Sequence, residues 1–302
     1  MPAQRSEGLG ALLLGAGLLG FAAIFVRWAA PASPLVIGFY RMLFALPGVL
    51  ALVLLERGEH ASEPAGIGRA PVWAVAAGVC FIFDLWLWHL SVEYTSVANS
   101  TMLVGLSPLW VAIASVALFG ARLRRRSWAG LALALAGALV LGLAKGARWG
   151  TGLGELLGAA ASVAYAFFTL ALARARAGMS ARRVLAVVSF TCLAGFAFLA
   201  LAQGHAFTGF PTRAWGSLLG LGLLVQVLAW WLISWGLGHV DANLGSIGLL
   251  VQPVATVGLG WLLLAEGVKP VQGLGSLLIL AGIALAAFAP PGVARGKEGA
   301  PD

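Results

Sequence analysis

The chain has 302 residues, of which 61% are hydrophobic and only 10% carry a charged side chain. A soluble domain usually has about 25% charged residues, so this composition excludes an ordinary water-exposed surface and indicates a polytopic membrane protein. The net charge of +8 comes from basic residues in short connectors such as RLRRRS (122–127), without a basic helix face. We therefore do not expect nucleic acid as a partner.

Ten apolar runs follow one another along the chain, and each is long enough to cross a hydrocarbon core about 30 Å thick as a helix. Helices are favoured over barrel strands because the runs are continuous and rich in Leu and Ala. The expected fold class is an all-α polytopic membrane protein with ten transmembrane helices, at 9–27, 34–55, 70–91, 97–119, 127–145, 153–173, 183–203, 214–237, 243–264 and 271–289.

The positions of Lys and Arg predict the orientation of this bundle. Ten crossings put both chain ends on one side of the membrane. Of the 19 Lys and Arg residues, 13 lie on that side, five lie on the other, and Arg41 lies inside a helix. Cytoplasmic connectors carry the excess of basic residues, so the N- and C-termini are predicted to be cytoplasmic.

The chain resembles itself at a shift of 145 residues. Pro108 then aligns with Pro253, the pair Trp86–Leu87 aligns with Trp231–Leu232, and several glycines and small residues of the fifth and tenth runs coincide. Each half contains five helices, an odd number, so the halves cross the membrane in opposite senses. The sequence thus predicts two inverted five-helix repeats, 1–147 and 148–302, a common plan of secondary transporters.

Both repeats have a proline inside the fourth helix. Proline lacks the N–H that closes a helical turn, so Pro108 is expected to free the carbonyl of Val104 and Pro253 that of Leu249. Interrupted helices at matching places in two repeats indicate a hinge or a cavity wall near the binding site. The alternative is a static bend whose carbonyl is satisfied by a neighbouring helix.

This arrangement resembles the EamA-type transporters of the drug/metabolite transporter superfamily over nearly the whole chain. Similar stretches are FAAIFVRWA (21–29), GFYRMLFALP (38–47) and LLAEGVKPVQGLGSLLILAGIAL (263–285). The resemblance implies an inner-membrane transporter of small metabolites, typically an exporter of amino acids or amphipathic compounds, that works without nucleotide hydrolysis. One departure is that the glutamate that often ends the fourth helix is present as Glu266 in the second repeat and replaced by Ala121 in the first.

Arg41 and Asp84 are the most expensive residues of the predicted helices to place in a membrane, at a cost of at least about 2.5 kcal/mol each near the bilayer centre. Both are expected about 10 Å from the outer surface at 1.5 Å per helical residue, on consecutive helices. The sequence predicts an ion pair between them. It could be purely structural, it could bind the charges of a zwitterionic substrate, or Asp84 could couple transport to protons.

Polar residues four positions from a tryptophan mark two helix faces that suit an amphipathic ligand. These faces carry Asp84 with Trp88 and Gln226 with Trp230. The alternative is that the tryptophans belong to the interfacial belts. Further candidates for substrate binding, or for plain hydrogen bonds between helices, are Asn99, Tyr165 and Gln252, while Glu155 is a candidate for coupling or for simple exposure at the outer boundary.

The expected function is export of amino acids or related small metabolites by alternating access through a central cavity. The expected partners are the small-molecule substrate, membrane lipid and, as a candidate coupling ion, the proton. A multidrug exporter or a passive facilitator is the alternative within this class, and an intramembrane enzyme or a non-transporting scaffold is the alternative outside it. An enzyme is not expected, because the four histidines lie in or beside loops and Asp84 has no second buried carboxylate beside it. No metal or cofactor is expected, since Cys80 and Cys192 lie inside apolar runs without metal-binding spacing.

Overall fold

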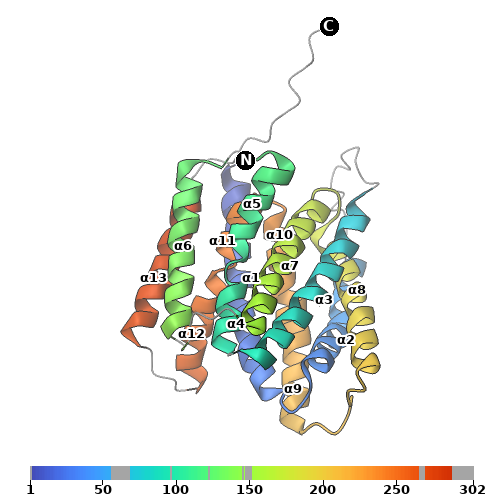
Figure 1. Ribbon diagram of the computed structural model, residues 1–302. Helices are drawn as coiled ribbons and strands as arrows, with labels where there is room; N and C mark the ends of the chain where they lie inside the picture. Colours follow the sequence, from blue (N-terminus) through green and yellow to red (C-terminus); the bar gives the residue numbers. More distant parts are fainter. Residues whose placement is uncertain are drawn as a thin grey trace.

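The computed structural model describes residues 2–55, 69–95, 97–121, 123–144, 146, 152–264 and 269–287. Within these ranges nine helical segments are long and apolar enough to cross a membrane, and Met102–Leu118 is a shorter apolar helix. They form one bundle in which α1 begins and α13 ends at the same end (Figure 1). We call this the terminal end, and the opposite end, which carries residues 203–211, the far end.

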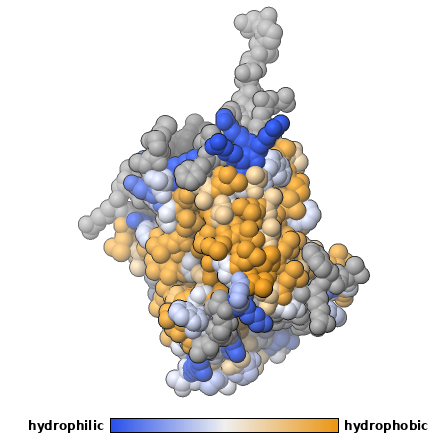
Figure 2. Space-filling view, turned by 90° about the vertical axis from the view of Figure 1, so that its left-hand side faces the viewer, coloured by the Kyte–Doolittle hydropathy of each residue, from blue (hydrophilic) through white to orange (hydrophobic). Residues whose placement is uncertain are grey.

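A band of hydrophobic residues crosses the visible face of the bundle between two polar ends (Figure 2). Large apolar side chains such as Leu54, Phe198 and Leu262 are well exposed on the outside of the helices. Such a surface is stable against lipid and not against water. The chain is therefore a multi-pass membrane protein.

The helices follow the predicted order with small changes at their ends. The first repeat contains α1 (Pro2–Trp28), α2 (Pro34–Leu54), α3 (Ala70–Tyr94), α4 (Val97–Val104), α5 (Ser107–Phe119) and α6 (Arg125–Ala144). The second contains α7 (Leu153–Arg176), α8 (Ala181–Ala202), α9 (Thr212–Gly220), η2 (Leu221–Ala229), α10 (Trp230–Leu237), α11 (Ala242–Gly248), α12 (Val251–Leu264) and α13 (Pro270–Ala287). The predicted boundary at 147/148 and Glu266 lie outside the described residues.

The fourth helix of each repeat is split at its proline. Pro108 lies in the first turn of α5 and Pro253 in the first turn of α12, where a missing N–H costs no helical hydrogen bond. The expectation of a free Leu249 carbonyl is wrong, because this oxygen accepts a hydrogen bond from the Gln252 N–H at 3.0 Å. The shorter-range hydrogen bond of a tighter turn at the helix end therefore satisfies the carbonyl for which Pro253 has no N–H.

The contact between α6 and α13 displays the relation between the two repeats. A Cβ atom on Gly137 would lie 2.6 Å from the carbonyl oxygen of Gly275, and one on Gly130 would lie 2.7 Å from that of Gly282. Gly275 and Gly282 are the counterparts of Gly130 and Gly137 at the shift of 145. Gly137 therefore touches the counterpart of Gly130, and Gly130 touches the counterpart of Gly137. A two-fold axis between the repeats requires this exchange.

The same exchange relates other helix pairs. The helix α3 packs along α7, and its counterpart, the span formed by α9, η2 and α10, packs along α1. The helices α6 and α13 run in opposite directions (Figure 1), so the two-fold axis lies in the membrane plane. The fold consists of two inverted five-helix repeats.

The close glycine contact gives a prediction about stability. We expect Gly137→Ala to lower the free energy of unfolding by about 1–3 kcal/mol, because the added methyl group meets the backbone of α13 and forces the helices apart. The control is Gly273→Ala on α13, where a Cβ meets nothing within 4 Å. Thermal unfolding in detergent measures both, and equal melting temperatures would contradict the proposed contact.

Candidate functional site

A buried guanidinium lies at the centre of the bundle, on α2. The Nε of Arg41 donates a hydrogen bond to Oε1 of Gln226 at 2.9 Å, and the Nε2 of Gln226 lies 3.5 Å from Oγ of Ser189. The guanidinium carbon is 5.6 Å from the ring centroid of Phe81, close enough for a cation–π interaction. Arg41 thus links α2 to α3 and to the eighth span, and Gln226 links that span to α8.

Gln226 reaches this point from an unusual backbone. Residues Leu221–Ala229 form a π-helical stretch, a rare conformation that is found mostly as single-turn bulges and often at functional sites. The wider turn changes the direction in which side chains leave the helix, and the Gln226 side chain is 1% exposed. Sequence periodicity for an α-helix cannot predict this stretch.

The predicted ion pair between Arg41 and Asp84 does not form. Asp84 is buried, and its Oδ1 has no hydrogen-bond partner among the described residues. Asp84 nevertheless lies one helical turn from Phe81, whose ring is 5.6 Å from the guanidinium carbon of Arg41. The prediction failed because it compared only the membrane depths of residues on the second and third helices. It could not foresee that the amide of Gln226, from the eighth span, would compete for Arg41.

Three aromatic rings form a layer next to these polar groups. Phe81 on α3 stacks on Phe168 on α7, with ring centroids 4.8 Å apart. Trp230 on α10 meets both rings edge-on, at 5.7 Å from Phe81 and 5.0 Å from Phe168. The arrangement offers two faces and one edge to an apolar group.

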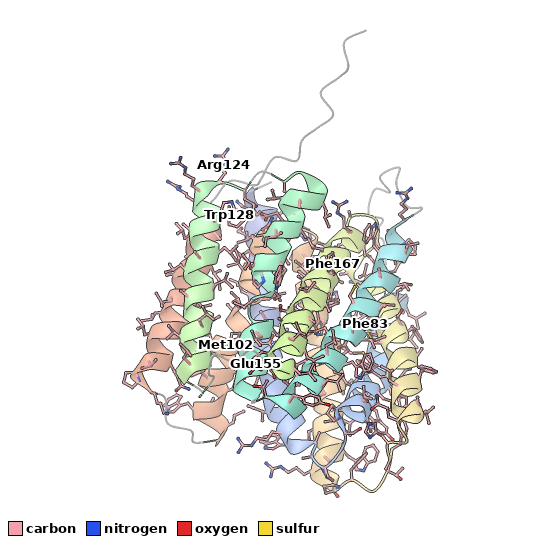
Figure 3. The ribbon with its side chains drawn as sticks, viewed as in Figure 1. Phe83, Met102, Arg124, Trp128, Glu155 and Phe167 are labelled. Atoms are coloured by element: carbon pink, nitrogen blue, oxygen red, sulfur yellow. The ribbon has the colours of Figure 1, made fainter. Side chains whose placement is uncertain are left out.

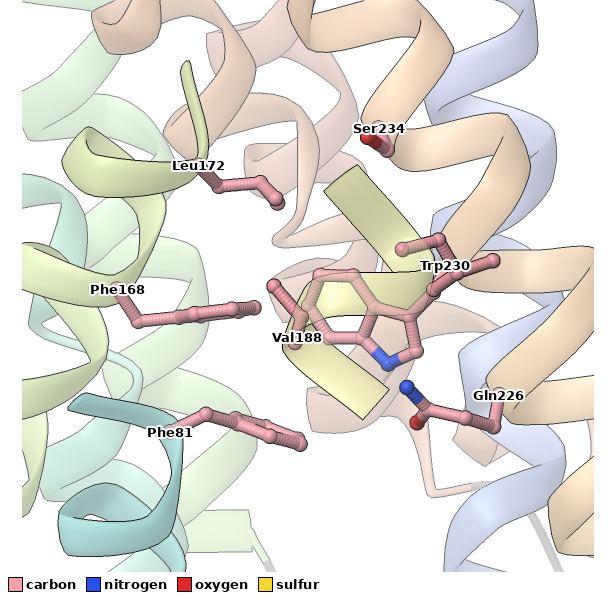
Figure 4. A pocket seen from close by; sticks show the side chains of 8 residues that line it. Phe81, Phe168, Leu172, Val188, Gln226, Trp230 and Ser234 are labelled. Carbon is pink, nitrogen blue, oxygen red and sulfur yellow. The ribbon is translucent and has the colours of Figure 1, made fainter. Parts of the chain in front are cut away.

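A small cavity opens between these rings and the helices α8 and α10 (Figure 4). It is lined by Phe81, Phe168, Leu172, Leu185, Val188, Gln226, Trp230 and Ser234. It leaves about 10 Å³ for the centre of a water-sized sphere, which is room for about one water. The indole Nε1 of Trp230 and the Oγ of Ser234 are both buried without a hydrogen-bond partner among the described residues. Since buried polar atoms are normally paired, these two atoms are free to bond a ligand.

The remaining predicted residues divide into two groups. Tyr165 lies with the site, because its ring is 5.7 Å from that of Phe168. Trp88 and Gln252 are half-buried and do not line the cavity. The side chain of Asn99 lies outside the described residues.

Glu155 lies away from the cavity, in the first turn of α7 at the far end (Figure 3). Its Oε1 accepts a hydrogen bond from Oγ1 of Thr95 at 2.7 Å, which ties the end of α3 to the start of α7. Nearby, Oγ of Ser91 is hydrogen-bonded to the Gly154 carbonyl at 2.7 Å. Polar side chains at this place bind the two helices together.

An arginine covers the cavity on the terminal side. The Nε of Arg176, at the end of α7, donates to the backbone carbonyl of Ser234 at 2.8 Å, and its Nη1 donates to the carbonyl of Met179. The α7–α8 connection is thereby tied to α10 at the residue whose side chain lines the cavity. No sequence pattern distinguished Arg176 from the other basic connector residues.

An aromatic cluster joins α2 to the loop 203–211 on the far side of the bundle. The hydroxyl of Tyr40 donates to the carbonyl of Phe207 at 2.7 Å, and the Tyr40 ring lies 4.9 Å from that of Trp215. Phe39 packs edge-on against Phe207 at 5.1 Å. The loop 203–211 is thus held against α2 directly beside Arg41.

This loop contact gives a second prediction. We expect Tyr40→Phe to speed backbone hydrogen exchange in residues 203–211 by about 2- to 10-fold, because one buried hydrogen bond is worth about 0.5–1.5 kcal/mol. The control is Tyr94→Phe, which removes the same hydroxyl from an exposed side chain at the end of α3. Unchanged exchange in Tyr40→Phe would show that the hydroxyl does not hold the loop.

Comparison with known proteins identifies the family. The sequence profile of the EamA-like transporter family matches residues 6–143 and again residues 152–288. The chain belongs to this family. A solved crystal structure superposes on this EamA-like chain with a TM-score of 0.77 at 21% identity, covering 93% of this chain and 97% of the other. At that identity the likeness shows the fold alone.

Proteins similar in sequence to this EamA-like chain are named as transporters. "Uncharacterized transporter YetK" of Bacillus subtilis is 31% identical over 212 residues, which cover 67% of this chain and 63% of the relative. An "Uncharacterized transporter" of Archaeoglobus fulgidus is 26% identical over 92% of this chain and 96% of its own length. A "Probable terminal-alkyne amino-acid exporter" of Streptantibioticus cattleyicolor is 29% identical over 62% of this chain and 63% of its own length.

Phe81 and Phe168 are among the cavity residues of this EamA-like chain that were missed in the sequence. A phenylalanine in an apolar helix carries no signal of its own, since the exposed Phe83 and Phe167 lie only one or two positions away in the same helices. A usable signal existed for one of them: Phe81 is the repeat counterpart of Gln226, because 226 − 81 = 145. The shift therefore selects Phe81 once Gln226 is a candidate.

Proposed function

We propose that this EamA-like chain is a secondary transporter that exports amino acids or related small metabolites by alternating access. The observation that carries the proposal is the buried group of Arg41, Asp84 and Gln226 beside the rings of Phe81, Phe168 and Trp230. Polar groups that fix a ligand's orientation beside apolar walls are the usual composition of a small-molecule site. Charges inside a membrane are costly and mark such sites.

The distribution of basic side chains supports cytoplasmic termini in the inner membrane. The terminal end of the described chain has more basic residues than the far end, which matches the positive-inside rule. Arg124 at the terminal end is visible in Figure 3. Apart from Arg41 inside α2, the described Lys and Arg residues are Arg5, Arg69, Arg124, Arg125, Arg126, Arg174, Arg176, Arg182 and Arg183 at the terminal end, and Arg27, Arg213 and Lys269 at the far end.

Ties at the two ends of the bundle support a closed state between two open ones. Arg176 ties α7 to α10 on the proposed cytoplasmic side, and Tyr40 ties the loop 203–211 to α2 on the proposed outer side. In alternating access the two open in turn, by rocking of the repeats and bending at the helix breaks. We propose Pro108 and Pro253 as the hinge positions.

Export of amino acids is supported by the Streptantibioticus relative, which is named a probable terminal-alkyne amino-acid exporter. A proton is our candidate coupling ion, with Asp84 as its carrier or with Glu155 at the outer end in this role. Both carboxylates lie on helices that line the proposed path.

Counterflow into proteoliposomes tests the function. Purified protein is reconstituted, loaded with each of a panel of unlabelled L-amino acids, and diluted into the labelled amino acid, with and without a pH gradient. We expect accumulation of at least one neutral amino acid without added nucleotide, and a greater initial rate with a gradient if protons are coupled. Accumulation no greater than in empty liposomes across the panel would contradict the proposal.

A further inference from the structure

Arg41 has two possible acceptors, and it is bonded to the weaker one. A guanidinium forms its strongest hydrogen bonds with carboxylates, and Asp84 lies one helical turn along α3 from Phe81, whose ring is 5.6 Å from the Arg41 guanidinium carbon. The Nε of Arg41 nevertheless donates to the amide oxygen of Gln226, while Oδ1 of Asp84 is left without a hydrogen bond. The amide must therefore be held firmly in place.

The surroundings of Gln226 supply that restraint. Its side chain is 1% exposed, it projects from the π-helical stretch, and its Nε2 lies 3.5 Å from Oγ of the fully buried Ser189 on α8. With both ends of the amide engaged, its oxygen stays directed at Arg41. A free glutamine could turn away and leave the Nε of Arg41 without this acceptor.

We propose that Gln226 is a positioning residue that keeps Arg41 from neutralising Asp84, so that the site offers two separate opposite charges to a zwitterionic substrate with an apolar side chain. This inference rests on the proposed transport function. Asp84 Oδ1 accepts from the ammonium group. The remaining N–H groups of Arg41 and the unpartnered Nε1 of Trp230 donate to the carboxylate.

The direction of the helices gives the orientation of the substrate. Asp84 lies one turn nearer the far end than Phe81 on α3, Tyr165 one turn nearer than Phe168 on α7, and Gln226 one turn nearer than Trp230. The polar groups thus form a layer on the far side of the rings. Leu172, Leu185 and Ser234 line the cavity on the terminal side. The charged end of the substrate points to the far end and its side chain to the terminal end.

Competition by matched analogues tests the need for both charges. Counterflow of labelled L-leucine is challenged with unlabelled L-leucine, 3-methylbutylamine, which lacks the carboxylate, and 4-methylpentanoate, which lacks the ammonium. L-phenylalanine is tested in the same way against phenethylamine and 3-phenylpropanoate. We expect each amino acid to inhibit at a concentration at least about tenfold lower than either analogue, since a hydrogen bond to a charged group is worth at least that factor.

Charge substitutions test the role of Gln226 itself. In Gln226→Glu the new carboxylate neutralises Arg41, so the ratio of amine to amino-acid affinity should rise at least about tenfold. In Asp84→Asn the affinity for the acid, relative to that for the amino acid, should rise instead. If Gln226→Glu does not fold, this opposite shift is the result that tests the proposal. The matched control is Gln203→Glu at the exposed end of α8, which should shift neither ratio.

The outcomes separate the inference from the function beneath it. Preference for the zwitterion together with the opposite shifts in the two variants supports the inference. Equal inhibition by an analogue and its amino acid, or a folded Gln226→Glu with unshifted ratios, overturns the inference and leaves transport intact. If no labelled amino acid moves in the unsubstituted protein, the proposed function fails, and the inference fails with it.

Discussion

Replacing Arg41 by methionine should lower amino-acid counterflow by about 30-fold or more. Removing one member of a buried set of charges and hydrogen bonds costs about 2–5 kcal/mol, and here it deprives the substrate carboxylate of its cation. It also leaves Oε1 of Gln226 without its donor and Asp84 without an opposite charge nearby. Methionine fills a similar volume, so packing changes little.

A matched substitution tells whether this effect is specific to Arg41 or follows from the loss of any arginine. Arg213→Met removes a guanidinium that lies 4.7 Å from the ring of Trp28 at the far end, away from the cavity. We expect its counterflow to stay within about twofold of the unsubstituted protein, since an exposed cation–π contact is worth about 0.5–1 kcal/mol. Gel filtration and thermal unfolding establish that both variants are folded. Equal activity of Arg41→Met and Arg213→Met would remove Arg41 from the site.

Replacing Pro108 and Pro253 together by alanine should lower the maximal transport rate by about tenfold and leave the apparent substrate affinity unchanged. Alanine restores an N–H and strongly favours helix, so α4 with α5, and α11 with α12, would tend to become continuous. Stiffer helices slow the exchange between inward- and outward-open states without touching the binding groups.

The chain contains a control for this prediction. Pro47 lies inside α2 without interrupting it, so Pro47→Ala makes the same chemical change where no break exists. Its maximal rate should be unchanged. If the double variant transports as fast as Pro47→Ala, the two prolines shape the helices but are not hinges.

The sequence was sufficient to predict the membrane-spanning helices and their order along the chain. Hydrophobic run length and the shift of 145 residues predicted the ten spans and their inverted pairing, because bilayer thickness and backbone hydrogen bonding leave few alternatives. The prolines marked both breaks. Their carbonyl partners were not predictable, since Leu249 is served by a local turn that depends on backbone detail.

The site was only partly predictable, for a related reason. Helical spacing joined Gln226 to Trp230 as one face, and insertion cost singled out Arg41 and Asp84. Which of these meet depends on contacts between helices distant in sequence, and on the π-helical stretch that directs Gln226 to Arg41. Neither the spacing nor the depth of a residue contains that information.

The central claim is that the cavity at Ser234 opens to each side of the membrane in turn. A single cysteine at this position, Ser234→Cys with Cys80 and Cys192 replaced by alanine, reports it through labelling with a membrane-impermeant thiol reagent applied from either side. The account predicts labelling from both sides and protection by a transported amino acid, because the same cavity binds the substrate in each state. Labelling from one side only, or labelling from both sides that a transported amino acid leaves unchanged, would contradict it.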